Sequence, residues 1–135
     1  MRKKKSTKGH LVKSYAEGIK KKVLEKHRES IKRVVGRKSG IYLLSKGKKL
    51  YYIGLSNKLA SRLKDHLDDK HRRKWDRFSL YSIGKKKYLK DVESILVRII
   101  KPPGNAQEGS FGKNKNLKGK LIEELKRDML ASFSD

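Results

Sequence analysis

Residues 40–54 read GIYLLSKGKKLYYIG, with two short apolar runs on either side of a turn-like segment. The apolar runs cover residues 40–44 and 50–54, and glycine and lysine dominate the five residues between them. Short runs of β-branched and aromatic residues that are separated by such a segment are typical of two paired strands. We therefore predict a β-hairpin across residues 40–54.

The residues that follow the hairpin predict a mixed fold. Leu59, Leu63 and Leu67 repeat at four-residue spacing, which indicates a helix with one buried face. Residues 75–83 resemble a strand. Residues 88–99 repeat as a helix, which Pro102 and Pro103 end because proline disfavours helical geometry before it and donates no backbone hydrogen bond. We expect an α+β fold, in which a small three-stranded antiparallel sheet is flanked by helices.

Three segments extend this unit. Residues 1–12 are expected to form a disordered basic arm, because so charged a run buries too little apolar surface to offset its ordering entropy. Residues 13–38 are expected to form an N-terminal amphipathic basic helix, since apolar residues from Tyr15 to Val34 recur at helical spacing. Residues 118–135 predict a final helix that covers the sheet or docks a partner.

Charge indicates the kind of partner. The chain has 38 Lys and Arg against 14 Asp and Glu, a net charge of +24. Such an excess favours a polyanion, and nucleic acid is the leading candidate. A binding protein of the ribosomal or chromatin type explains the charge at least as well as an enzyme does.

Composition also excludes several classes of site. The sequence has no cysteine, which rules out disulfides, thiolate zinc sites and cysteine nucleophiles, and it allows a reducing compartment. No apolar segment is long enough for a secretory signal or for a membrane span of about 20 residues. We expect a cytoplasmic protein with no membrane partner.

The two halves of the hairpin carry a recognisable pair of motifs. Residues 40–42 and 52–54 resemble the paired tripeptides of the GIY-YIG nuclease family, and Arg62, Glu93 and Asn105 match further family positions in the right order. The resemblance covers residues 39–117 and implies a small sheet sandwiched by helices, with metal-dependent cleavage of DNA. The structural positions of the motif are Gly40, Ile41, Ile53 and Gly54.

Tyr42 and Tyr52 are candidate catalytic residues. On adjacent strands their hydroxyls are expected to reach one face, and the pKa of a phenol, ordinarily near 10, falls beside cations and a metal. Either tyrosine then accepts a proton from the attacking water or orients it, and the resemblance places both at the active site. The alternative is packing, since tyrosine is a common strand residue, and this is our interpretation of Tyr51.

Arg62 and His66 lie four residues apart, so they share one side of the predicted helix. A guanidinium suits the negative charge that grows on phosphate oxygens during cleavage, and Arg62 matches the family arginine. His66 either assists the base or holds a phosphate. We interpret His71 and Asp69 as surface residues.

Glu93 lies on an otherwise apolar helix, where an unpaired carboxylate is costly, so we expect a cation beside it. That cation is either a lysine in a salt bridge or the metal ion that the resemblance implies. One carboxylate fits a single Mg²⁺ or Mn²⁺ ion, which takes its other ligands from water and phosphate. Asp91 is the rival ligand.

Asn105 follows the rigid turn at residues 101–104. Its amide is expected to bind phosphate or to fix Glu93, unless it is a plain turn residue. Lysines around the predicted site should position the nucleic acid through its phosphates. These are Lys58, Lys64, Lys101, Lys113, Lys115 and Lys118.

The sequence thus predicts an endonuclease in which Glu93 holds a metal, a tyrosine activates water and Arg62 neutralises charge. The alternative is a basic nucleic-acid-binding module without catalysis. A membrane-surface or partner-binding helical protein explains the charge but not the hairpin motifs.

Overall fold

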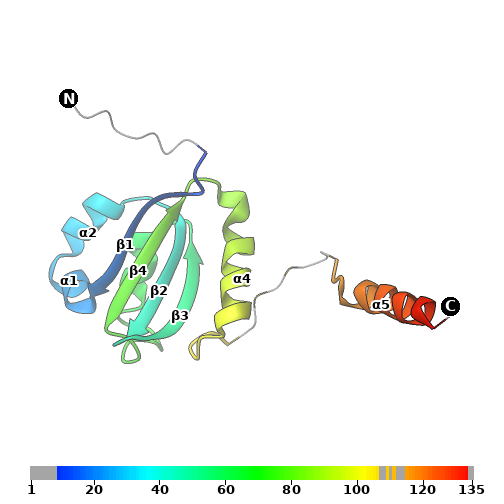
Figure 1. The fold of residues 1–135 in the computed structure, drawn as a ribbon. Coiled ribbons are helices and arrows are strands. Elements are labelled where there is room, and N and C mark those ends of the chain that lie inside the picture. The colour runs from blue at the N-terminus through cyan, green and yellow to red at the C-terminus, as the bar shows by residue number, and fades with distance from the viewer. Residues whose placement is uncertain (1–8, 107–108, 110, 112–114, 134–135) are drawn as a thin grey trace.

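The fold is built on a four-stranded antiparallel sheet (Figure 1). The structure is a computed structural model, and it describes residues 9–106, 109, 111 and 115–133. The strands lie in the order β1-β4-β2-β3. Their bounds are β1 Val12–Lys20, β2 Gly40–Lys46, β3 Lys49–Ser56 and β4 Arg77–Ile83. The predicted α+β fold and hairpin are confirmed, but the sheet has four strands, not three.

Helices cover both faces of the sheet (Figure 1). One face carries α1 (Lys21–Lys26), α2 (Arg28–Val35) and α3 (Leu59–Asp65), and the other carries α4 (Leu89–Ile100), which a short 3-10 helix, η1 (Lys86–Tyr88), precedes. Because side chains alternate along a strand, Tyr42 of β2 packs among α1, α2 and α3 while its neighbour Ile41 packs against α4. The sheet therefore separates two apolar cores.

The predicted N-terminal helix is wrong over its first half. Val12–Lys20 forms β1, which pairs with the edge of β4, and the helical part is divided into α1 and α2 on either side of His27. A register shift lies between Ala16 and Ile19, where Gly18 has a positive φ of 65°, a conformation that favours glycine. This irregularity places Ala16 and Ile19, three residues apart, against the same core. The predicted helical spacing began with Tyr15 and Ile19, but Tyr15 is 68% exposed and stacks on Tyr81 of β4 instead of packing in this core. Residues 1–8 of the expected arm lie outside the described residues.

The predicted C-terminal helix is present as α5 (Lys118–Ser132), but the expectation that it covers the sheet is wrong. None of its residues is buried, and Figure 1 shows it beyond α4 and away from the sheet. Docking to a partner stays a prediction. Within the part of the chain that the structure describes, no helix is long and apolar enough to cross a membrane.

The two motif glycines allow close approaches that no side chain permits. A Cβ atom at Gly40 would lie 1.9 Å from the carbonyl oxygen of Tyr81 on β4, and one at Gly54 would lie 2.3 Å from the hydroxyl of Tyr42. Glycine in a strand often marks such a contact. These residues therefore set how closely β4 and the Tyr42 ring approach the hairpin.

Candidate active site

A bulge in β3 directs two adjacent tyrosines to the same side of the sheet. Leu44 pairs with Tyr52 and Ser45 pairs with Leu50, so Tyr51 is an extra residue in the ladder. Both tyrosines then pack against the core on the α3 side, whereas regular alternation would have separated them. Bulges recur beside active sites because they redirect side chains.

Tyr42, His66 and Asp69 form a hydrogen-bonded chain. Tyr42 is fully buried, and its hydroxyl lies 2.7 Å from Nε2 of His66. Nδ1 of His66 lies 2.7 Å from a carboxylate oxygen of Asp69. A carboxylate accepts hydrogen bonds, so Nδ1 carries the proton and Nε2 accepts the bond from Tyr42. Asp69 thereby fixes the tautomer of His66.

A second tyrosine and histidine share the same carboxylate. The hydroxyl of Tyr51 lies 2.7 Å from Nδ1 of His71, and the backbone N–H of His71 donates to the other carboxylate oxygen of Asp69 at 2.8 Å. His71 is only 6% exposed. Our interpretations of Asp69 and His71 as surface residues, and of Tyr51 as packing alone, are therefore wrong. The available signal was an aspartate three residues after His66 and two before His71.

Burial keeps these groups in their neutral forms. It raises the pKa of Tyr42 well above the ordinary phenol value, an effect that the hydroxyl of Tyr52 reinforces and the charge of Arg62 opposes. Burial likewise raises the pKa of Tyr51, with Asp69 adding to it. The pKa of His66 is lowered by burial, which outweighs the opposing effect of Asp69. A neutral phenol thus donates to a neutral imidazole.

Arg62 lies on the side of α3 that faces the tyrosines, as predicted. Its side chain is 44% exposed and lies 3.8 Å from the carboxylate of Asp65. Partial burial lowers the pKa of Arg62, but Tyr42 and Tyr52 together have a larger, opposite effect, so the pKa lies above its ordinary value. The guanidinium therefore stands beside both phenols and remains open to solvent.

Glu93 and Tyr52 line one cavity at the edge of the sheet, with a volume of about 260 Å³. The described residues that line it also include Lys70, Lys90, Val97, Gly104, Asn105, Ala106 and Gly109. The side chain of Glu93 is 16% exposed and lies 3.1 Å from Nζ of Lys90. The salt bridge to a lysine, one of the two expected alternatives, is thus present beside Glu93, and the metal ion stays a prediction. The cavity joins a carboxylate of α4 to a phenol of β3.

Asn105 is occupied by the backbone of β3. Its side chain accepts the N–H of Ile53 at 2.9 Å and donates to the carbonyl of Ile53 at 2.8 Å. Neither of these bonds joins Asn105 to Glu93, so the expectation that its amide fixes Glu93 is not met among the described residues, whereas contact with phosphate stays a prediction because the amide nitrogen has a second N–H. Asn105 thus holds the loop after α4 against β3 and forms one wall of the cavity.

A comparison with models of known protein families establishes the family of this chain. The family model described as the GIY-YIG catalytic domain matches residues 38–120. The chain belongs to the GIY-YIG family. It is therefore a nuclease, which is a hydrolase, and the resemblance inferred from residues 40–54 is confirmed.

Solved structures of GIY-YIG domains share this fold. The N-terminal endonuclease domain of UvrC from Thermotoga maritima, bound to magnesium as its catalytic divalent cation, is 16% identical, with a TM-score of 0.51 over 60% of this chain and 98% of that one. A tyrosine-to-phenylalanine point mutant of that domain, bound to its catalytic divalent cation, is also 16% identical, with a TM-score of 0.52 over 61% and 98%. No curated protein matches this chain.

The residues at the cavity fit a divalent ion of the kind that this GIY-YIG fold binds in UvrC. Among the described residues that line the cavity, Glu93 is the one carboxylate. No group of three or more His, Cys, Asp or Glu side chains is placed to hold a metal in the described part of the chain. A single carboxylate suits magnesium, which keeps several waters and binds substrate phosphate.

The structure divides the predicted site residues of this GIY-YIG nuclease into two adjoining groups. Tyr42, Arg62 and His66 surround the ring of Tyr52, which in turn lines the cavity with Glu93 and Asn105. The predicted phosphate contacts are more scattered. Lys58 and Lys64 line a separate groove, Lys101 follows α4, Lys115 and Lys118 precede and begin α5, and Lys113 lies outside the described residues.

The buried histidines make stability depend on pH. Burial lowers the pKa of both His66 and His71, so the folded state binds fewer protons than the unfolded chain, whose histidines titrate near about 6.5. Their contribution is therefore full above that pH and is lost as the pH falls through the lower folded values. We expect the melting temperature to fall as the pH drops below about 6.5. His27→Gln, at an exposed position, should melt like the wild type, and a constant melting temperature would contradict the assignment of buried neutral imidazoles.

Proposed function

We propose that this chain is a metal-dependent endonuclease that hydrolyses phosphodiester bonds of DNA at the cavity beside β3. One observation carries the proposal: Glu93 lines the same cavity as Tyr52, and the Tyr52 ring lies against Tyr42 and His66, with ring centroids 6.0 and 5.4 Å away. A candidate metal ligand and a chain of proton-transferring groups thus meet at one point. The net charge of +24 supplies the attraction to DNA.

Glu93 would hold a single Mg²⁺ or Mn²⁺ ion together with a phosphate oxygen and water. When bound, that ion supplies Lewis acidity at the scissile phosphate and at the leaving 3′-oxygen. Arg62, half-exposed beside both phenols, neutralises the charge that grows on the other phosphate oxygens. Asn105 holds the wall of the cavity and acts as a positioning residue.

The proton of the attacking water leaves through the tyrosines. Tyr52 lines the cavity, whereas Tyr42 is fully buried and its hydroxyl is bound to His66. We therefore assign Tyr52 to the water. As water attacks phosphorus, its proton moves to Tyr52, the proton of Tyr52 moves to Tyr42, and that of Tyr42 moves to Nε2 of His66. The carboxylate of Asp69 stabilises the resulting imidazolium, as in other acid–base relays.

Water attacks phosphorus in line as the bond from phosphorus to the 3′-oxygen breaks, and that oxygen takes a proton from solvent water in the open cavity. The products carry 5′-phosphate and 3′-hydroxyl ends. The rival proposal is a basic binding module without catalysis. The charge alone favours the two equally, but the pairing of Glu93 with the tyrosine cluster in one cavity favours the nuclease.

A substrate panel tests this function. The purified chain is incubated with supercoiled plasmid, linear duplex, branched DNA and RNA, each with magnesium and each with excess chelator. We expect cleavage of at least one DNA with magnesium, no cleavage with chelator, and 5′-phosphate product ends. Tight binding to these probes without cleavage of any of them, in magnesium or in manganese, would support the binding module instead.

A further inference from the structure

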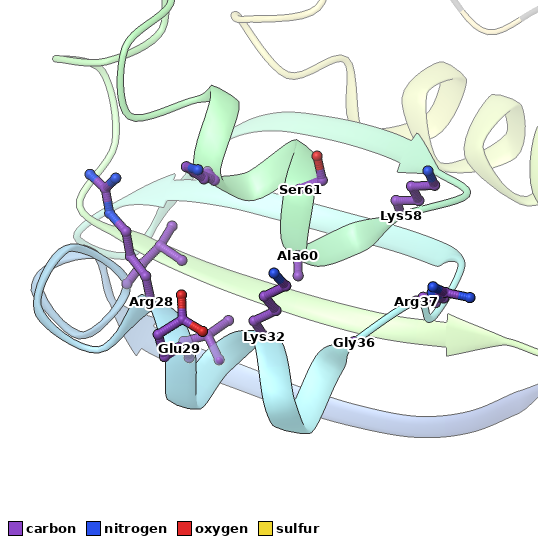
Figure 2. A pocket seen from close by; sticks show the side chains of 11 residues that line it. Arg28, Glu29, Lys32, Gly36, Arg37, Lys58, Ala60 and Ser61 are labelled. Carbon is purple, nitrogen blue, oxygen red and sulfur yellow. The ribbon is translucent and has the colours of Figure 1, made fainter.

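A basic groove lies between α2 and α3, apart from the catalytic cavity (Figure 2). Its volume is about 470 Å³, and five exposed cationic side chains line it. These are Arg28, Lys32, Arg37, Lys58 and Lys64. Figure 2 shows Arg37 and Lys58 at one end of the groove, Arg28 at the other and Lys32 between them.

Within the described part of the chain, the charge of the groove is not balanced. Glu29 is the one carboxylate among the described residues that line it, against five cations. No hydrogen bond or ion pair joins any of these five side chains to another described residue. Like charges around one concavity repel each other and concentrate counter-ions there. A polyanion in the groove would relieve that repulsion.

The floor of the groove is apolar. Leu24, Ile31 and Ala60 line it beneath the charged rim, and Leu24 belongs to the core between the sheet and the helices. A rim of cations over an apolar floor matches a nucleotide, whose phosphates contact the rim while the sugar and base cover the floor. The volume also exceeds what a single inorganic phosphate fills.

One short helix connects the groove to the active site. Ala60, Ser61 and Lys64 of α3 line the groove, whereas the intervening Arg62 reaches Tyr42 and Tyr52. The two sites therefore lie on different sides of α3. A helix with its side chains is about 10–12 Å across, and a DNA strand rises about 3.4 Å per nucleotide. The separation corresponds to roughly three nucleotides.

We propose that this groove binds the sugar-phosphate backbone of the substrate strand, roughly three nucleotides from the bond that is cut. The proposal rests on the proposed nuclease function and gives it a second contact with DNA. Lysine and arginine on phosphates fix the register of a bound strand without reading its sequence. The groove thus positions the scissile phosphate beside Arg62 for any sequence.

A charge-matched pair of triple variants tests the groove. Arg28→Gln, Lys32→Gln and Arg37→Gln together remove three groove cations, two on α2 and one just after it. Lys85→Gln, Lys86→Gln and Lys87→Gln remove equal charge from exposed positions before α4. Affinity for a fluorescein-labelled DNA duplex is measured by anisotropy in chelator over a range of salt. We expect the groove variant to bind at least about tenfold more weakly at moderate salt, with a salt slope reduced by about three. The control variant should lose clearly less affinity, and its salt slope should fall by clearly less.

Equal losses in the two variants, or wild-type affinity in the groove variant, would overturn the proposal. So would loss of binding to phosphatidylserine vesicles in the groove variant with DNA affinity unchanged, because the groove would then be a membrane contact. A series of duplexes is then shortened so that one end approaches the bond that is cut. When fewer than roughly three nucleotides remain between that end and this bond, the wild type should bind no more tightly than the groove variant. A wild-type advantage that survives this shortening would also overturn the proposal.

Cleavage separates this proposal from the proposed function. The three replaced side chains lie on α2 and just after it, and none of them reaches the phenols or Glu93, so at saturating substrate the groove variant should still cut with magnesium, at a rate lowered only by the lost positioning. If DNA binding depends on the groove while the wild type cuts no substrate, the groove is supported and the nuclease function fails. If the wild type cuts and the groove variant binds normally, the groove proposal alone fails.

Discussion

Replacing Glu93 by alanine should abolish cleavage while DNA binding persists. The carboxylate is the one acidic group among the described residues that line the cavity, so the variant loses the proposed metal ligand and keeps the basic surface. A metal ion contributes several kcal/mol to such a reaction, so the rate should fall by roughly a thousandfold or more. Affinity in chelator should stay equal or rise, because the removed charge repels phosphates.

The fold should tolerate this change. The partner of Glu93, Lys90, is 66% exposed, and an ion pair with so exposed a partner contributes about 0–1 kcal/mol. The melting temperature should therefore shift little. Asp91→Ala, which removes an exposed carboxylate from the same helix, is the matched control and should cut normally. A folded Glu93→Ala protein that cuts at the wild-type rate in magnesium would rule out this metal site. A loss of cutting in Asp91→Ala would indicate that Asp91 is the metal ligand instead.

Tyr42→Phe and Tyr52→Phe should each lower the cleavage rate by roughly a hundredfold or more. Each variant removes one hydroxyl from the proposed proton path and keeps the ring that packs in the core. Tyr42→Phe also leaves Nε2 of His66 without the hydroxyl that it contacts at 2.7 Å, so it should cost stability as well. Tyr52→Phe should melt close to the wild type.

A third phenylalanine variant serves as the control for these rates. Tyr15→Phe changes a tyrosine that is 68% exposed on β1, away from the cavity, and it should cut like the wild type. The rates are measured in a single turnover with saturating enzyme, so that binding does not contribute. Near-wild-type rates in both active-site variants would reduce Tyr42 and Tyr52 to packing residues and refute the proton path.

The parts of the fold that depend on local pattern were predictable from sequence. The hairpin of residues 40–54 has a regular apolar pattern and a lysine-rich turn, and α4 has helical spacing and a proline stop. β1 was not predictable in this way, because Tyr15 and Ile19 have the four-residue spacing of a helix, although Tyr15 is exposed on the strand whereas Ile19 packs against the core. What makes it a strand is the open edge of β4, some sixty residues away in the chain.

The candidate site shows the same division. Arg62 lies in α3 and His66 caps its C-terminal end with helical backbone geometry, so their grouping follows from the four-residue spacing. Tyr51, Asp69 and His71 join the site through a bulge and through hydrogen bonds between segments, which no local pattern reveals. Asn105 lines the cavity, and its contact with the backbone of β3 was not expected from the sequence. Long-range contacts therefore set the details that the motif alone does not contain.

The dependence of the single-turnover cleavage rate on magnesium concentration tests the central claim most directly. It is measured on the DNA that the substrate panel identifies, with the wild type and Glu93→Ala side by side. The account predicts no cleavage in chelator, a hyperbolic rise with magnesium as one bound ion requires, and no rise in the variant. Cleavage that continues in chelator, or a magnesium response that Glu93→Ala shares with the wild type, would contradict it.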